Sequence, residues 1–206
     1  MDSAARHAVA RIHSGRPDRF TEEVLPAAVL NRHLPWAEQD YLALGETTWR
    51  IELLDGELLI GPPPSFRHQV IVGNLLSTLT TGCRATGLTP LPVINLRLAA
   101  GRILNPDLVV TTDFEADALC LPAAAVRLVG EVSAPHTAVV DRVLKMHCYA
   151  VAGIEWYLLV EQETLTMHLY QGQGSQYVER SVTEPGETLE LTEPVPATIR
   201  PEQLVA

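Results

Sequence analysis

The dipeptide Asp55-Gly56 constrains the fold most, because it stands between two short apolar runs, WRIELL and ELLI. Asp-Gly is one of the strongest signals for a two-residue turn, since both residues tolerate the positive φ angles that a tight hairpin requires. The segment therefore predicts a β-hairpin. A hairpin places antiparallel strands in the fold.

Short apolar runs and a few helical stretches make up the rest of the chain. Ser65 can cap a helix whose apolar face follows at helical spacing, and Gly153 can end a later one. The predicted helices cover 36–45, 66–82 and 138–152, and the predicted strands after the hairpin cover 92–99, 102–112, 125–133, 155–161, 165–171, 177–182 and 188–193. This order predicts an α+β fold: a mixed, mainly antiparallel sheet flanked by helices, with extra hairpins at both ends.

The length of 206 residues favours one domain with an appendage. Residues 1–35 mix charges and prolines without a sustained hydrophobic period, which predicts an N-terminal extension that is partly helical at 22–33. The patterned signals begin at Trp36. We therefore expect the domain to cover 36–206.

Charge and cysteine content exclude several classes of protein. A net charge of −10 excludes a protein that coats polyanions through clustered Lys and Arg, although it allows a local basic cleft. Three cysteines without CxxC spacing argue against a disulfide framework or a structural zinc site and fit a reducing compartment. No run approaches the roughly 20 apolar residues of a membrane span, and the N-terminus does not resemble a signal peptide. We expect a soluble, cytoplasmic protein.

Three ionisable residues stand where chemistry is plausible. Asp107 lies early in one predicted strand and Glu131 near the end of another, so antiparallel pairing would bring the two carboxylates together. Such a pair repels unless a cation neutralises it, and oxygen ligands suit Mg²⁺ or Mn²⁺. Lys145, the only lysine, lies in the next predicted helix. From there its ammonium could position a water or stabilise the charge that develops during phosphodiester cleavage.

Each of these residues also has an ordinary structural role that the sequence leaves open. Asp107 follows a proline and suits a turn, Glu131 suits a solvated strand end, and Lys145 could form an i,i+4 surface pair with Asp141. The functional interpretation rests on the three residues together.

The pattern PD-x(23)-ExS followed by a helical lysine resembles the PD-(D/E)xK nuclease superfamily. More closely, the chain is similar to the Uma-two family over residues 36–205 in three segments: YLALGETTWRIELLDGELLIGPPPSFRHQVI, RILNPDLVV and GEVSAPHTAVVDRVLKMHCYAVAGIEWYLLV. The resemblance implies a restriction-endonuclease-like core, αβββαβ, and an endonuclease that hydrolyses DNA with Mg²⁺ or Mn²⁺. Asp107 and Glu131 would then be metal ligands.

The resemblance also implies roles for neighbouring residues. The superfamily lysine normally stands at the position of Ser133, so its role passes to Lys145 as the third catalytic residue beside Asp107 and Glu131. Glu57 matches the DGE motif and would be a further metal ligand, or else a solvent-facing hairpin residue. His68 would line the cleft or bond a phosphate, or else be structural. Other candidate phosphate contacts, whose usual role is solvated surface charge, are Arg67, Arg97, Arg102 and Arg142.

Departures from the family pattern keep other functions open. Ala134 and His136 replace two hydroxyl residues near the expected site, which weakens catalysis if those hydroxyls orient a water or the helix start. His136 could itself act as a donor. The second hypothesis is therefore a non-catalytic protein of the same fold that binds nucleic acid or a partner protein. A third is a homodimer joined through the C-terminal hairpins, whose runs YLLV and MHLY are apolar.

Overall fold

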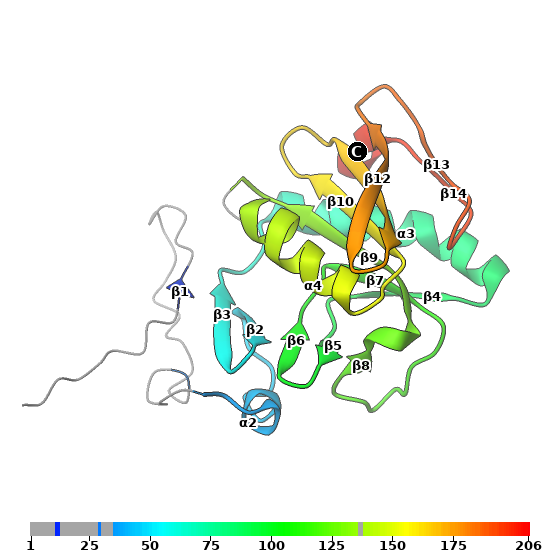
Figure 1. The fold of residues 1–206 in the computed structure, drawn as a ribbon. Coiled ribbons are helices and arrows are strands. Elements are labelled where there is room, and N and C mark those ends of the chain that lie inside the picture. Colours follow the sequence, from blue (N-terminus) through cyan, green and yellow to red (C-terminus); the bar gives the residue numbers. More distant parts are fainter. Residues whose placement is uncertain (1–10, 13–28, 30–34, 136–137) are drawn as a thin grey trace, which may run out of the picture.

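A computed structural model describes residues 11–12, 29, 35–135 and 138–206 (Figure 1). The helix expected at 22–33 lies almost wholly outside these residues, as do His136 and the expected helix start at Thr137. No helix in the described part of the chain is long and apolar enough to cross a bilayer. The strands form two six-stranded sheets and one two-stranded sheet, which confirms the α+β class and divides the expected sheet in two.

The first sheet contains the predicted hairpin and has the strand order β1-β3-β2-β6-β5-β8. Asp55 and Gly56 form its turn with φ angles of 51° and 88°, the conformation that the Asp-Gly signal predicts. Parallel pairs join β1 to β3 and β5 to β8, and the other pairs are antiparallel. The strands are β1 (Arg11–Ile12), β2 (Arg50–Leu54), β3 (Glu57–Gly61), β5 (Leu96–Ala99), β6 (Arg102–Leu104) and β8 (Leu121–Pro122).

The second sheet has the order β12-β11-β10-β9-β7-β4, and its only parallel pair in the described chain is β9 with β10. It confirms the expected strand at 125–133 and the hairpin at 155–171. The strands are β4 (Thr89–Pro92), β7 (Leu108–Thr111), β9 (Val126–Ser133), β10 (Trp156–Glu161), β11 (Met167–Gln173) and β12 (Gln176–Thr183). The third sheet pairs β13 (Leu189–Leu191) with β14 (Ala197–Ile199), so the expected edge strand at 188–193 pairs outside the main sheets.

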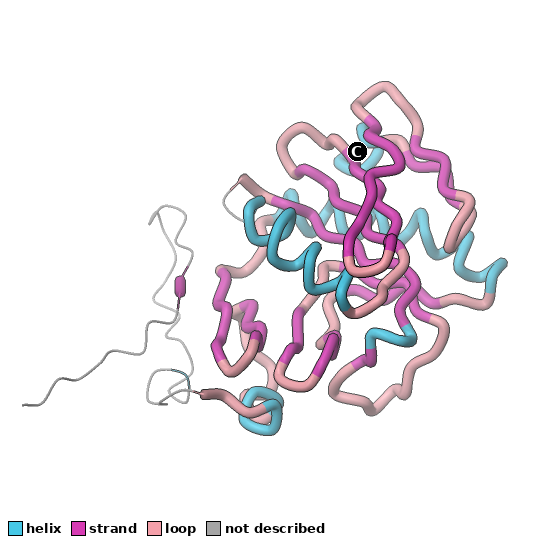
Figure 2. The backbone as a smooth tube through the Cα atoms, in the orientation of Figure 1, coloured by secondary structure: helices cyan, strands magenta, loops and turns pink. Residues whose placement is uncertain are grey.

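Helices cover both faces of the second sheet (Figure 2). Helix α3 (Phe66–Thr86) begins where Ser65 Oγ accepts a hydrogen bond from the His68 amide, as its sequence predicts, and runs four residues past the expected end. The helix predicted at 138–152 contains a π-helical stretch (Val140–Lys145) before α4 (Met146–Val151). The remaining helical segments are α2 (Glu38–Leu42) and the short 3₁₀ turns Ala123–Ala125 and Pro201–Val205.

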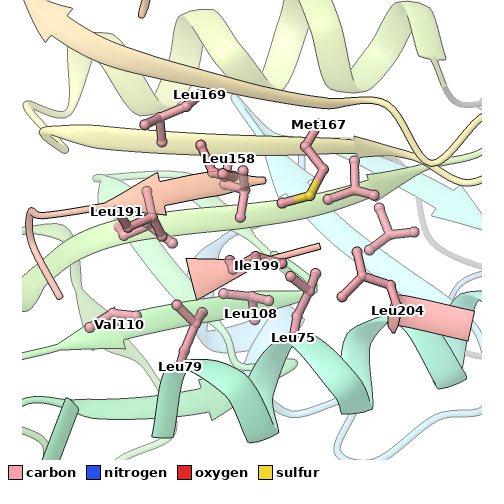
Figure 3. Close-up of a cluster of buried hydrophobic side chains, with 14 of the residues drawn as sticks. Leu75, Leu79, Leu108, Val110, Leu158, Met167, Leu169, Leu191, Ile199 and Leu204 are labelled. Atoms are coloured by element: carbon pink, nitrogen blue, oxygen red, sulfur yellow. The ribbon is translucent and has the colours of Figure 1, made fainter. Parts of the chain in front are cut away.

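Alternation along the strands separates the two layers of the core. In β7, Leu108 and Val110 pack in the cluster that contains Leu75 and Leu79 of α3 (Figure 3), whereas Val109 packs with residues of α4. The period of two along a strand explains this division, because successive side chains point to opposite faces. Asp107 and Glu131 share the parity of the α4 side, so both carboxylates belong to the layer between the sheet and that helix.

Two predictions of continuous strands are wrong. Of the expected strand at 92–99, only Pro92, the last residue of β4, and 96–99, which form β5, lie in strands. The expected strand at 102–112 divides into β6 and β7. In both cases the two parts belong to different sheets. Pro106 has no amide hydrogen for a ladder and breaks the second strand. Val93, with a φ of 23°, breaks the first, and its amide donates to the Asp107 carbonyl at 3.1 Å. The two breaks therefore lie side by side, at the junction of the sheets.

The C-terminal apolar runs lie in the core. Leu158, Leu159 and Met167 are fully buried within the chain itself, so they do not form an exposed surface for a second copy. The homodimer stays a prediction, without the apolar surface from which we inferred it.

Candidate active site

Strand pairing brings Asp107 next to Glu131. Strand β7 runs antiparallel to β9 with Leu108 opposite Gly130, so the residue before Leu108 faces the residue after Gly130. The Val132 amide donates to Asp107 Oδ2 at 2.7 Å, which fixes this register from the side chain as well. The predicted meeting of the two carboxylates at one sheet edge is confirmed. Both residues are about 1% exposed.

Asp107 is held as an anion by three donors. Arg50 Nη2 donates to Oδ1 at 2.6 Å, and His68 Nε2 lies 3.0 Å from Oδ2, which also accepts from Val132. Burial alone would raise the pKa of Asp107, but the Arg50 guanidinium, together with His68 and the Val132 amide, holds that pKa well below its usual value. His68 is thus a buried partner of Asp107. Its Nδ1 has no hydrogen-bond partner among the described residues.

Glu131 and Lys145 form a second pair in the same layer. Lys145 Nζ lies 3.3 Å from Glu131 Oε1, 2.9 Å from Glu52 Oε1 and 3.8 Å from Asp141 Oδ1. Burial alone would lower the pKa of Lys145, but attraction to Glu131 and Glu52 outweighs burial and raises it. The side chain is 4% exposed and stays charged. Lys145 is therefore an internal cation, and its contact with Asp141 is buried.

Glu131 experiences opposing influences. Burial raises its pKa, attraction to Lys145 opposes that rise, and repulsion from Asp107 adds to it, so that the pKa lies above the usual value. The buried hydroxyl of Tyr149 donates to Oε1 at 2.7 Å, so Oε1 has two donors. The Nη2 atom of Arg50 lies 3.9 Å from the other oxygen, Oε2. Oε2 is therefore the oxygen with spare capacity to bind another group.

Sequence reasoning missed several residues of this buried ion cluster. Arg50 and Glu52 come from β2 in the first sheet, and Tyr149 comes from α4. Glu52 accepts from the Asn105 amide at 2.7 Å as well as from Lys145, which ties the two sheets together. A charged residue flanked by Ile51 and Leu53 was a usable signal. Simple alternation places Glu52 on the face opposite Ile51 and Leu53, and nothing in the sequence shows that the segment with Lys145 covers that face.

Other predicted site residues lie elsewhere. Glu57 is exposed at the first residue of β3, at the turn end of the hairpin, and the structure does not bring it to the carboxylate pair. Arg67 is exposed, and its Nε donates to the Gln162 carbonyl at 2.9 Å. The three remaining candidate phosphate contacts each have a carboxylate partner: Arg97 pairs with Glu38, Arg102 with Asp55 and Arg142 with Glu161.

A pocket of about 500 Å³ reaches the cluster from solvent. Its wall includes Arg50, Asp107 and Asn105 on the inner side, and Trp49 and Val93 among its other lining residues. Glu131 and Lys145 do not line this pocket. Of the charged residues in this cluster, Arg50 and Asp107 are the two that line the pocket.

Two carboxylates are the smallest donor set with which this cluster could contact a divalent cation. In the described residues no group of three or more His, Cys, Asp or Glu side chains forms a metal site, so a cation here would have the two carboxylates Asp107 and Glu131. Mg²⁺ commonly takes only one or two carboxylates and completes its shell with water and substrate phosphate. The charges agree: four buried carboxylates (Glu52, Asp107, Glu131 and Asp141) against two cations (Arg50 and Lys145) leave a formal charge of −2.

Comparison with known proteins identifies a family and a fold. The family model Uma2, described as "Putative restriction endonuclease", matches residues 38–202. Among solved structures the chain is similar to a crystal structure from Anabaena variabilis of "a putative nuclease belonging to DUF820", with a TM-score of 0.64 and 20% identity over 83% of this chain and 98% of that chain. This likeness shows the fold. No curated protein matches the sequence.

Proposed function

Because the chain belongs to the Uma2 family, we propose that it is a metal-dependent endonuclease that hydrolyses phosphodiester bonds in DNA. The restriction-endonuclease-like fold expected from the sequence is shared with the solved structure. The observation that carries the proposal is the meeting of Asp107, Glu131 and Lys145 in one buried layer, next to a solvent-connected pocket. Paired carboxylates can hold a catalytic divalent cation, and a nearby ammonium can stabilise the charge that develops during phosphodiester hydrolysis.

In this proposal the two carboxylates bind the cation through the oxygens that other donors leave available. His68 and the Val132 amide occupy Asp107 Oδ2, and Tyr149 and Lys145 occupy Glu131 Oε1. Apart from Arg50, which donates to Asp107 Oδ1, no donor named here contacts Asp107 Oδ1 or Glu131 Oε2, so these are the oxygens that would hold Mg²⁺ or Mn²⁺. A bound cation would act as a Lewis acid that activates water and offsets charge on the phosphate.

Lys145 would supply a second positive charge, in addition to that of the cation. Glu52 and Asp141 hold its ammonium beside Glu131, so the Lys145 side chain has little freedom to turn elsewhere. A fixed, buried positive charge stabilises a developing negative charge more strongly than a solvated one does, because no water must reorganise during the reaction. In this proposal Lys145 would stabilise the transition state and Glu52 would position Lys145.

The proposal is tested by nicking of supercoiled plasmid in Mn²⁺ buffer. We compare the wild type with Asp107→Asn, which keeps the shape of the side chain but removes its charge. Asp117→Asn is the matched control, because Asp117 is exposed in a loop. Nicking by the wild type and the control, with at least about a hundredfold loss in Asp107→Asn, is expected. Equal nicking by all three proteins would refute the assignment and indicate a contaminating nuclease.

A second measurement separates the enzyme from the non-catalytic alternative. Calorimetric titration with Mn²⁺ should give heat in the wild type and none in Asp107→Asn. If neither protein binds the metal and neither nicks DNA, the fold has been kept without its chemistry. A non-catalytic protein that binds nucleic acid or a protein partner is then the better description.

A further inference from the structure

Arg50 lies between the two carboxylates that we propose as metal ligands. Its Nη2 atom is 2.6 Å from Asp107 Oδ1 and 3.9 Å from Glu131 Oε2, and it also donates to the Asn105 carbonyl. The side chain is 23% exposed, against 2% and 1% for its two carboxylate neighbours. The guanidinium therefore covers the outer side of the pair, toward the pocket that it lines.

The position of Arg50 conflicts with that of a divalent cation. The two oxygens that other donors leave available, Asp107 Oδ1 and Glu131 Oε2, are the two that face Nη2. A cation bound to both would stand where the guanidinium now stands, and the two positive groups would repel. With neither group there, the two buried carboxylates would repel each other with only Lys145, which contacts Glu131 Oε1, to offset their charge, and this is unfavourable. One positive group at a time satisfies both constraints.

We propose that Arg50 is an exchangeable counterion: its guanidinium neutralises the Asp107–Glu131 pair in the metal-free protein and must leave the pair when a divalent cation binds. The inference rests on the proposed function for the identity of the cation. It makes Arg50 a positioning residue that sets the metal affinity of the site. Arg50 and Asp107 line the pocket whereas Glu131 does not, so departure of Arg50 would uncover the pair on the pocket side.

Departure of Arg50 costs the Asn105 carbonyl one donor, but the place of Arg50 at the margin of the cluster favours its release. Arg50 is the first residue of β2. Its side chain is the most exposed of the six charged residues in the cluster, which are Arg50, Glu52, Asp107, Glu131, Asp141 and Lys145. The pocket beside it, of about 500 Å³, can accommodate a displaced guanidinium. Asp107 keeps two of its donors, His68 and the Val132 amide, after the exchange.

The test is calorimetric titration of Mn²⁺ into the wild type, Arg50→Gln and Arg102→Gln. Arg102→Gln is the matched control, since it removes the same charge and also deprives a carboxylate, Asp55, of its partner, but at the surface. Removing a competing charged hydrogen bond should tighten Mn²⁺ binding by about tenfold or more in Arg50→Gln. Arg102→Gln should bind as the wild type does. Unchanged or weaker binding in Arg50→Gln overturns the inference.

A second measurement asks whether position or net charge is responsible. Free guanidinium chloride at low concentration should compete with Mn²⁺ in Arg50→Gln, whose site is vacated, more than the same concentration of NaCl does. Equal effects of the two salts would mean that only long-range charge is involved, and would overturn the exchange. Melting temperatures with and without Mn²⁺ confirm that each variant is folded, and Mn²⁺ should raise that of Arg50→Gln more than that of the wild type.

These measurements separate this inference from the proposed function. Metal binding by the wild type that depends on Asp107, without tightening in Arg50→Gln, refutes the exchange and leaves the nuclease proposal intact. Binding by Arg50→Gln alone supports the exchange, but it contradicts a metal-dependent activity of the wild type. Absence of binding in both proteins refutes both proposals.

Discussion

Replacing Lys145 with Met should destabilise the protein by several kcal/mol, because it leaves buried carboxylates without their cation. The ammonium lies 3.3 Å from Glu131 and 2.9 Å from Glu52. At an effective dielectric constant of about 20, opposite charges 3.3 Å apart attract by about 5 kcal/mol. Desolvation of the lysine offsets part of this attraction, and loss of one partner from a buried pair typically costs roughly 3–5 kcal/mol. Met preserves most of the apolar stem, so cavity formation adds little.

Urea denaturation measures the effect, with Arg142→Met as the matched control. Arg142 lies three residues earlier in the same helical segment and pairs with Glu161, but its side chain is 36% exposed. A surface pair of this kind contributes at most about 1 kcal/mol to the free energy of unfolding. We therefore expect a large loss of stability from Lys145→Met and a small one from Arg142→Met.

The double variant Lys145→Met, Glu131→Gln tests the cause. It removes one charge of each sign, so the formal charge of the cluster is the same as in the wild type. Its destabilisation should be smaller than the sum of the two single effects, with a coupling of about 1–3 kcal/mol. Additive effects of the two substitutions, or a decrease of less than about 0.5 kcal/mol in the free energy of unfolding of Lys145→Met, would refute the argument that the ammonium neutralises Glu131.

Two further predictions concern stability away from the cluster. Gly82→Ala should destabilise the protein, because a methyl group at this buried site in α3 would overlap a backbone carbonyl oxygen of the C-terminal segment. Gly73→Ala, in open space on the same helix, should stabilise the protein by about 0.5–1 kcal/mol. Thermal melts that rank the two variants the other way would contradict this packing. The pKa of Glu161 is lowered by the hydrogen bond from Thr164 and by Arg142, so its contribution to stability is present above the unfolded pKa of about 4.3 and is lost as the pH falls through the lower folded value. Urea midpoints of Glu161→Gln should therefore vary less with pH than those of the wild type below about pH 5, and parallel curves would refute the assignment.

Local signals in the sequence predicted the elements that short-range geometry determines. The Asp55-Gly56 turn, the Ser65 cap and the strand at 125–133 all depend on residues within a few positions of each other. The long-range pairing of β7 with β9 was also predictable, because it followed from one assumption about antiparallel neighbours. Asp107 and Glu131 were therefore placed together from the sequence alone.

The division into two sheets was not predictable in the same way. Pro106 interrupts a ladder, but a proline alone does not show whether a strand bends, ends or changes sheet. Whether the strand changes sheet at Pro106 depends on Val93, whose amide donates to the Asp107 carbonyl across the break. That contact joins segments fourteen residues apart and has no local signature.

Arg50 and Glu52 were missed for a related reason. Alternation within β2 assigns them to the face opposite Ile51 and Leu53, and an outward face on an antiparallel hairpin is usually solvated. Here that face meets a second sheet and the segment that carries Lys145, so its charges are buried and paired. Periodicity identifies a face, whereas tertiary packing decides what the face meets.

The junction of the two sheets explains why the site is built from ions. The chain passes from β4 of one sheet to β5 and β6 of the other and returns at β7, and Asp107 lies in the second break, directly before β7. Backbone amides and carbonyls at such a break lose their ladder partners, and polar side chains must replace them. Glu52 accepts from the Asn105 amide, Arg50 donates to the Asn105 carbonyl, and Asp107 accepts from Val132. The groups that satisfy the broken backbone are thus the same groups that create a buried, charged cluster, so catalytic tests on this cluster need a folding control in every variant.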